Sequence, residues 1–226
     1  MTSPTLEWRE ILVPGWPGPA LSLCLAVGQW ALWVEPDPKL RALWLDLSLG
    51  LVAPTQGQIL WFGQPCPRTE DFWAVCAWRA RLGWVGQTGQ LISGRPLLEN
   101  LALYYEYALG YPPSQSLAAA WGWLEKLDLT QEAQTPGERL AADQLPLARL
   151  ALALVKEPEL LLLDQPRRLF NQDFPRVWKL LLAEKATRDF ALVILDHRED
   201  HWGAELASQT LSLWAPGQAQ LTGGAP

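Results

Sequence analysis

The sequence predicts an α/β fold built on a largely parallel sheet, with a short region of antiparallel strands at its N-terminus. From Trp30 onward, short apolar runs alternate with segments of helical periodicity, which is typical of parallel strands joined by helices. Residues 6–34 instead alternate in polarity and contain the turn-forming run Val13-Pro14-Gly15-Trp16-Pro17-Gly18-Pro19, which favours antiparallel strands.

The expected elements follow one another in regular order. Apolar runs predict strands at 30–34, 58–62, 82–85, 160–163 and 190–195, and a terminal strand near 206–214. Helical spacing predicts helices over 40–51, 70–82, 96–110, 114–127, 145–156 and 174–187. The clearest strand is Leu160–Leu163, because four leucines before Asp164 are typical of a buried parallel strand that delivers a carboxylate to the sheet edge.

Composition limits the class of protein. A chain of 226 residues that is 49% apolar suits one large domain, and a net charge of −6 argues against a nucleic-acid partner. No apolar run reaches the roughly 18 residues that span a bilayer, and the N-terminus does not resemble a secretion signal. The three cysteines lack ligand spacing, which indicates a reduced, cytosolic chain. We expect the 14 tryptophans mainly to fill the core and surface, with some covered by a partner.

Four segments together resemble the nucleotide-binding subunit of ABC transporters, and the resemblance extends over about residues 6–218. Leu140–Pro166 follows the family without gaps from the signature loop to the acid-ended strand. Gly50–Ile59 is similar to the segment after the first helix, and Leu82–Gln87 to the strand that ends in the Q-loop glutamine. Val193–His197 is similar to the strand that ends in the switch histidine.

The resemblance implies a P-loop-NTPase-like core with a parallel sheet, an N-terminal antiparallel β subdomain and a helical subdomain. We expect one domain over residues 1–226, with the helical subdomain at about 88–145. The resemblance also implies two protein partners, an integral membrane permease subunit and a second ABC ATPase subunit in a homo- or heterodimer.

The phosphate-binding P-loop of the family falls on residues that do not suit it. Its glycines let consecutive backbone N–H groups face phosphate oxygens at a helix N-terminus, yet their positions hold Glu35, Pro38 and Leu40. The family lysine falls at Arg41, and the magnesium-binding Ser/Thr falls at Ala42, which has no side-chain oxygen. Two acids also place negative charge in this vestigial loop, which comprises Glu35, Pro36, Asp37, Pro38, Lys39, Leu40, Arg41, Ala42 and Leu43.

The family's other site positions are also altered. The catalytic glutamate falls at Gln165, which cannot accept a proton. The signature Ser-Gly-Gly-Gln falls at Ala141, Ala142, Asp143 and Gln144, where a carboxylate replaces a glycine. Gln87, Asp164 and His197 keep the family's residue types.

Each retained residue also has a purely structural interpretation. Gln87 suits a solvated amide at a strand end as well as a site edge, and Asp164 suits a capping acid. For His197 we favour a structural hydrogen bond. A metal site at His197 and His201 is disfavoured because no third ligand is apparent, so we expect no metal.

Two segments have interface and structural interpretations. The aromatic stretch Leu91–Tyr107 falls where the family receives a helix of its membrane subunit, but it also suits an amphipathic helix packed inside its own subdomain. The pair Arg167-Arg168 suits either solvated charges or a contact with a partner subunit.

These observations predict a degenerate, non-hydrolysing ABC-type subunit that docks on a permease as a structural or regulatory component. We expect it at the cytoplasmic face of the inner membrane, with no bound ATP or magnesium. One alternative is an active but divergent ATPase, with ATP and magnesium as cofactors, in which Arg41 replaces the lysine and a partner supplies the base. Another is a soluble binding module that reuses the fold.

Overall fold

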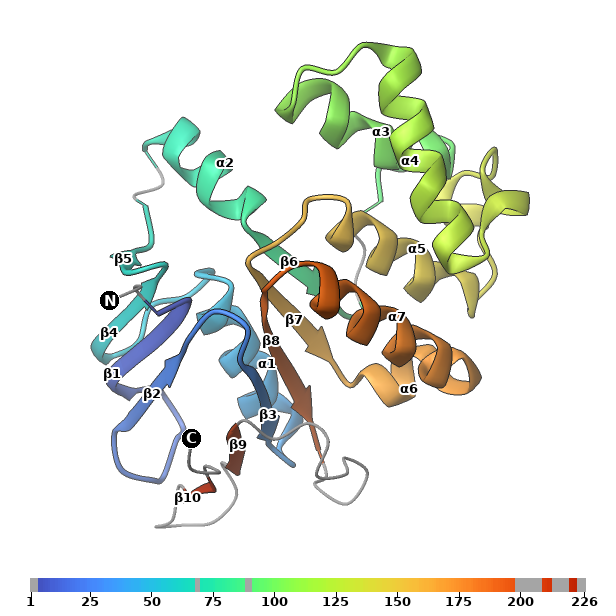
Figure 1. The fold of residues 1–226 in the computed structure, drawn as a ribbon. Helices are drawn as coiled ribbons and strands as arrows, with labels where there is room; N and C mark the ends of the chain where they lie inside the picture. The colour runs from blue at the N-terminus through green and yellow to red at the C-terminus, as the bar shows by residue number, and fades with distance from the viewer. Residues whose placement is uncertain (1–3, 68–69, 88–90, 198–208, 213–219, 223–226) are drawn as a thin grey trace. The chain divides into compact units, whose positions relative to one another are not determined.

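The computed structural model describes residues 4–67, 70–87, 91–197, 209–212 and 220–222. The chain divides into two compact units (Figure 1). The first comprises Met1–Leu82, Glu159–Gln165 and Arg188–Pro226, and the second comprises Gly83–Pro158 and Pro166–Thr187. The helical subdomain expected at about 88–145 falls inside the second unit.

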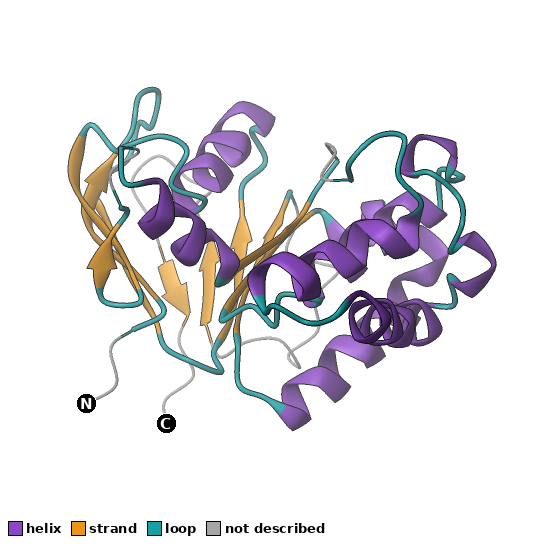
Figure 2. Ribbon diagram, turned by 90° about the horizontal axis from the view of Figure 1, so that it is seen from above, coloured by secondary structure: helices purple, strands orange, loops and turns teal. Residues whose placement is uncertain are grey.

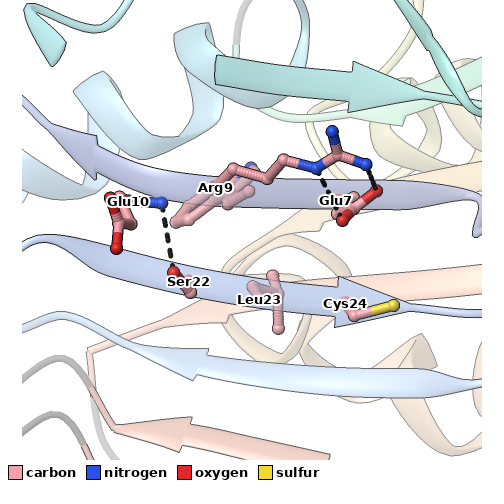
Figure 3. Close-up of a pocket in the computed structure, with 7 residues that line it drawn as sticks. Glu7, Arg9, Glu10, Ser22, Leu23 and Cys24 are labelled. Carbon is pink, nitrogen blue, oxygen red and sulfur yellow. Dashed lines mark hydrogen bonds and ion pairs between the residues drawn. The ribbon is translucent and has the colours of Figure 1, made fainter. Parts of the chain in front are cut away.

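The first unit contains an antiparallel sheet with strand order β2-β1-β4-β5. This order places the first two strands of the chain side by side, as the alternating polarity predicts. The outer face carries a Glu7–Arg9 ion pair and a hydrogen bond from the Glu10 amide to Ser22, around a depression of about 520 Å³ (Figure 3). The strands are β1 (Leu6–Leu12), β2 (Leu21–Leu25), β4 (Gln56–Trp61) and β5 (Gln64–Pro65).

The first unit also holds the predicted parallel strands. They run in the order β10-β9-β3-β8-β7, and only the terminal pair β9–β10 is antiparallel. Every residue of β3 and β8 is buried, which is typical of parallel strands covered on both faces. The terminal strand expected near 206–214 is present as β9, and the rest of that segment lies outside the described residues. The strands are β3 (Trp30–Val34), β7 (Leu160–Asp164), β8 (Ala191–Asp196), β9 (Gln209–Ser212) and β10 (Gln220–Thr222).

Helix α1 (Pro38–Ser48) begins two residues before and ends three residues before the sequence-based prediction. Asp37 caps the helix and Pro38 occupies its first position, a combination that starts a helix because proline needs no hydrogen-bond acceptor there. The helix stops because Gly50 adopts a left-handed φ of 65° just after it. Helix α2 (Phe72–Ala80) and strand β6 (Leu82–Val85) follow close to their expected positions.

Tryptophans fill much of the core of the first unit. Trp8, Trp33 and Trp44 are at most 1% exposed, and the Trp8 ring centroid lies 4.6 Å from that of Trp33 and 5.4 Å from that of Trp44. Trp61 is also buried and donates its indole hydrogen bond to the Ser48 carbonyl at 2.7 Å. The core role expected for these residues is confirmed, whereas Trp73 on α2 is 80% exposed.

The second unit is mainly helical (Figure 2). Leucines such as Leu97, Leu101 and Leu124 are fully buried in it. A π-helical turn at Tyr104–Ala108, which apolar spacing did not predict, continues α3. No helix among the described residues has the length and apolar character needed to cross a membrane. The helices are α3 (Leu97–Leu103), α4 (Pro113–Leu127), α5 (Gln144–Leu154), α6 (Pro166–Phe170) and α7 (Phe174–Thr187), with 3₁₀ turns at Thr130–Glu132, Gly137–Arg139 and Asn171–Asp173.

Candidate functional site

The carboxyl ends of three parallel strands bring several predicted site residues together. Strands β3, β8 and β7 are neighbours in the sheet, so the residues that follow them lie at one edge. The Glu35 amide donates to the Asp196 carbonyl at 2.8 Å, and the Gln165 amide donates to the Leu195 carbonyl at 2.8 Å. Within the first unit, the 35–43 loop therefore lies beside Asp164 and Gln165, as the family resemblance implies.

The side chain of Asp37 occupies the N-terminus of α1. The segment 35–43, which keeps the name 35–43 loop from the family's P-loop, consists of three residues before α1 and the first six residues of the helix. The Asp37 carboxylate accepts from the Lys39 amide at 2.8 Å and lies 3.5 Å from the Leu40 amide. The Arg41 amide donates to the Asp37 carbonyl at 2.9 Å, and Pro38 has no N–H. A phosphate would use these amides and the positive end of the helix dipole, which here face a carboxylate of the chain.

Arg41 connects this loop to the end of β7. Its Nη1 donates to the Glu35 carbonyl at 3.0 Å, and its Nε lies 3.5 Å from the Asp164 carboxylate. When the Gln165 side-chain oxygen faces the guanidinium, it accepts from Nε at 2.9 Å and also from Nη2. The arginine side chain is only 12% exposed, so these contacts form in a largely desolvated site. The cation at the family's lysine position is thus engaged by groups of the chain itself.

Glu35 is a buried acid at the first position of the loop. Its Oε1 accepts from the Asp37 amide at 2.9 Å, and the Trp44 side chain also interacts with the carboxylate. Burial raises the pKa of this carboxyl, while the Asp37 amide, the Trp44 side chain and the Arg41 charge act in the opposite direction. An ionised Glu35 would also repel a polyphosphate at this position.

This buried acid predicts a pH dependence of stability. Because the pKa of Glu35 is raised in the folded state, its favourable contribution is complete at low pH, where the carboxyl is protonated in both states. The contribution is lost as the pH rises from about 4 through the folded-state pKa, since ionisation then favours unfolding. We expect urea unfolding to show that Glu35→Gln gains stability relative to the wild type as the pH rises. A constant difference between the two proteins across this range would contradict the assignment.

His197 follows β8 and pairs with its neighbour in the chain. Its Nδ1 lies 2.9 Å from Asp196 Oδ1, and its backbone amide donates to the same oxygen at 2.7 Å. The imidazole is 44% exposed, whereas the Asp196 side chain is buried. The described residues contain no cluster of three His, Cys, Asp or Glu side chains that could hold a metal. His201, the other member of the considered metal pair, lies outside the described residues.

In the second unit, the signature-loop residues form the start of α5. The Asp143 carboxylate accepts from the Gln144 amide at 3.0 Å and caps the helix. The Gln144 side chain accepts from the Ala141 amide at 2.9 Å and donates to Glu132 at 2.6 Å. Ala141 and Ala142 carry no hydroxyl. The groups that remain at this loop are thus engaged within the second unit.

The side chain of Gln87 is exposed, and its backbone carbonyl accepts a hydrogen bond from Arg149, a residue that the sequence did not predict to be part of the site. Arg149 on α5 is 7% exposed, and its Nη1 donates to the carbonyls of Gly86 at 3.0 Å and Gln87 at 2.9 Å. The sequence signal for Arg149 is a single cation within the otherwise apolar run Leu145–Leu154. A lone charge in such a run indicates a specific buried partner.

The structure describes both segments that have an interface and a structural interpretation, Leu91–Tyr107 and Arg167-Arg168. In Leu91–Tyr107, Leu97, Leu98 and Leu101 are buried within the second unit, while Tyr107 is 77% exposed. This pattern supports an amphipathic helix packed in its own unit and leaves one aromatic side chain on the surface. The Arg167 guanidinium lies 4.7 Å from the centroid of the Phe174 ring.

A family model described as ABC transporter matches residues 43–168, which is more than half of the chain. The chain belongs to the ABC transporter family. The resemblance inferred from the four sequence segments is thereby confirmed. The match begins at Leu43, the last residue of the 35–43 loop.

Curated relatives are ATP-binding proteins of this family. The cytochrome c biogenesis ATP-binding export protein CcmA of Escherichia coli strain K12 is 27% identical over 139 residues, which are 61% of this chain and 65% of that protein. The Nod factor export ATP-binding protein I of Paraburkholderia xenovorans strain LB400 is 30% identical over 146 residues, which are 65% of this chain and 46% of that protein. The chain thus spans less than two thirds of the length of these relatives.

Solved structures show the same fold. An ATP-binding cassette in a dimeric post-hydrolysis state, bound to ADP and Pi, has a TM-score of 0.81 at 18% identity and covers 96% of this chain and 98% of its own. The structure of cbiO1 from Clostridium perfringens, part of the ABC transporter complex cbiONQ, has a TM-score of 0.77 at 16% identity. It covers 95% of this chain and 86% of its own. The predicted ABC ATPase fold class is confirmed.

Proposed function

We propose that this chain is a non-hydrolysing ATP-binding-type subunit of an ABC transporter, which docks on a membrane permease as a structural or regulatory component. The observation that carries the proposal is the occupancy of the α1 N-terminus by Asp37. The amides that would hold a phosphate are bonded to a carboxylate, and Arg41 is bonded to the loop and the end of β7. Nucleotide binding would have to break these contacts and bring polyphosphate close to acidic groups.

Three further residues support the loss of hydrolysis. Ala42 offers no oxygen to magnesium, and Gln165 cannot act as a base toward water. In this family each ATP site combines the P-loop of one subunit with the signature loop of the other. Since Asp143 places a carboxylate in the signature loop, the chain is also poorly suited to complete a partner's site.

We place the chain at the cytoplasmic face of the inner membrane, bound to its permease and paired with a second ABC subunit. The relatives are ATP-binding proteins named for export, which supports a role in transport. The chain would then stabilise the membrane subunit or modulate an ATPase-competent partner.

The decisive experiment is to purify the chain together with the products of its genomic neighbours and to titrate a fluorescent ATP analogue with magnesium. We expect no saturable binding up to about 1 mM and no phosphate release, because the phosphate-binding amides are already occupied. Co-elution of a membrane protein would support docking. Recovery of the chain without any membrane subunit would favour a free-standing binding module instead.

An Asp164→Asn variant is the control for turnover. Phosphate release that persists in this variant would come from a contaminating ATPase. Release that disappears in it would show that the chain hydrolyses ATP, and the non-hydrolysing function would then be wrong.

A further inference from the structure

A small cavity in the second unit has a buried arginine in its wall. The cavity volume is about 190 Å³. This is below the roughly 300–1,000 Å³ of pockets that hold small-molecule ligands, so it suits a single protein side chain. The lining residues are Leu91, Ser93, Gly137, Glu138, Leu145 and Arg149.

The arginine lacks a counter-ion among the described residues. Arg149 is 7% exposed. Its Nη1 atom donates two hydrogen bonds, to the backbone carbonyls of Gly86 and Gln87. Its Nε has no hydrogen-bond partner in the described part of the chain, and no carboxylate there lies within ion-pair distance. Burial lowers the pKa of this guanidinium, since the cation is held in a desolvated position. A carboxylate that enters the cavity would therefore stabilise this buried cation, which has no counter-ion among the described residues.

Glu138, the acidic residue that also lines the cavity, is not a counter-ion for Arg149. Glu138 is exposed, and both of its carboxylate oxygens accept from the Gly94 amide at 3.0 Å. These contacts hold its pKa low, so it remains ionised and opposes an incoming anion. Solvent screens this exposed charge more effectively than it screens buried Arg149, so the arginine dominates inside the cavity.

We propose that the cavity receives an acidic side chain, Asp or Glu, from the protein partner on which this chain docks. The proposal rests on the docking role given under Proposed function and names the chemistry that the partner presents. A carboxylate matches the planar fork of a guanidinium, and Leu91 and Leu145 provide apolar contacts for the methylene groups. A side chain carried by a docked protein is favoured over a free anion, because the rest of the interface holds it at the cavity at a high effective concentration.

The test is a selection of helix-forming peptides from a random library on the full-length protein. We expect peptides selected on the wild type to be richer in Asp and Glu than those selected on Arg149→Gln. Changing the single required acid of the best peptide to its amide should weaken binding about ten-fold, as expected for a lost charged hydrogen bond. Leu145→Trp fills the cavity while keeping Arg149, so it should remove the same preference even if Arg149→Gln fails to fold.

Arg139→Gln is the matched control, because Arg139 is an exposed arginine near the cavity and does not line it. It should keep the acidic preference. Equal acid content in the wild-type and Arg149→Gln selections, or a preference that survives Leu145→Trp, would overturn the proposal. So would competition by N-acetylglutamate N-methylamide at the same concentration as the peptide, because a free small molecule would then suffice. None of these results bears on nucleotide binding, so a failure here is distinguishable from a failure of the proposed function.

Discussion

Replacing Arg41 with alanine is expected to lower the free energy of unfolding by about 3 kcal/mol, as for removal of one partner of a buried ion pair. The guanidinium is largely buried and contacts the Glu35 carbonyl, the Asp164 carboxylate and the Gln165 amide. Without it, the carboxyl groups of Asp164 and Glu35 lose the positive charge that Arg41 supplies at the same sheet edge. Urea unfolding at neutral pH, followed by circular dichroism, measures the loss.

Arg9→Ala is the matched control for this experiment. Arg9 also forms an ion pair, with Glu7, but its side chain is 56% exposed, so we expect little change in stability. If Arg41→Ala lowered stability no more than Arg9→Ala, the 35–43 loop would not depend on its arginine. The interpretation of Arg41 as the connection between the loop and β7 would then be wrong.

Replacing Trp8 with alanine is expected to lower the free energy of unfolding by about 3–5 kcal/mol, the range for removing a buried aromatic side chain. Trp8 is 1% exposed and its ring contacts both Trp33 and Trp44. The truncation removes ring contacts on two sides and leaves a cavity that neighbouring indoles, which are rigid and large, cannot readily fill. Chemical denaturation measures this change directly.

Trp73→Ala removes the same side chain from an exposed position. Trp73 is 80% exposed on α2, so we expect a change within about 0.5 kcal/mol. Similar losses for Trp8 and Trp73 would show that the effect belongs to tryptophan removal in general. The core role of the buried tryptophans would then lose its support.

Elements with a clear apolar pattern were predictable from the sequence. Strand β6 and helix α7 match their predicted bounds, since an apolar run and a continuous amphipathic pattern each fix an element without tertiary information. The π-helical turn at Tyr104–Ala108 and the short strand β5 were not predicted, because too few residues carry a repeating pattern. The start of α1 depended on the Asp37-Pro38 cap, which spacing of apolar residues does not reveal.

The site was predictable in position and less so in its contacts. Counting along the chain from the segments that resemble the family placed Arg41 in the phosphate loop and Gln165 after the leucine strand. That these two residues bond each other follows only from the sheet order, which brings together positions far apart in the chain. Arg149 was missed because a helix-forming apolar pattern dominates its surroundings, and its bonds to Gly86 and Gln87 depend on tertiary structure.

The capping of α1 by Asp37 has a thermodynamic consequence for the chain in the cell. A protein that binds a ligand only in its folded state gains stability with ligand concentration, so a working ATP-binding subunit is stabilised when ATP is abundant. Under the proposed function the stability of this chain does not depend on ATP concentration, because the Asp37 carboxylate, which is part of the chain, always caps α1. Its melting temperature should then be the same in starved and well-fed cells. The fraction of the chain that is folded should not change with the ATP level of the cell.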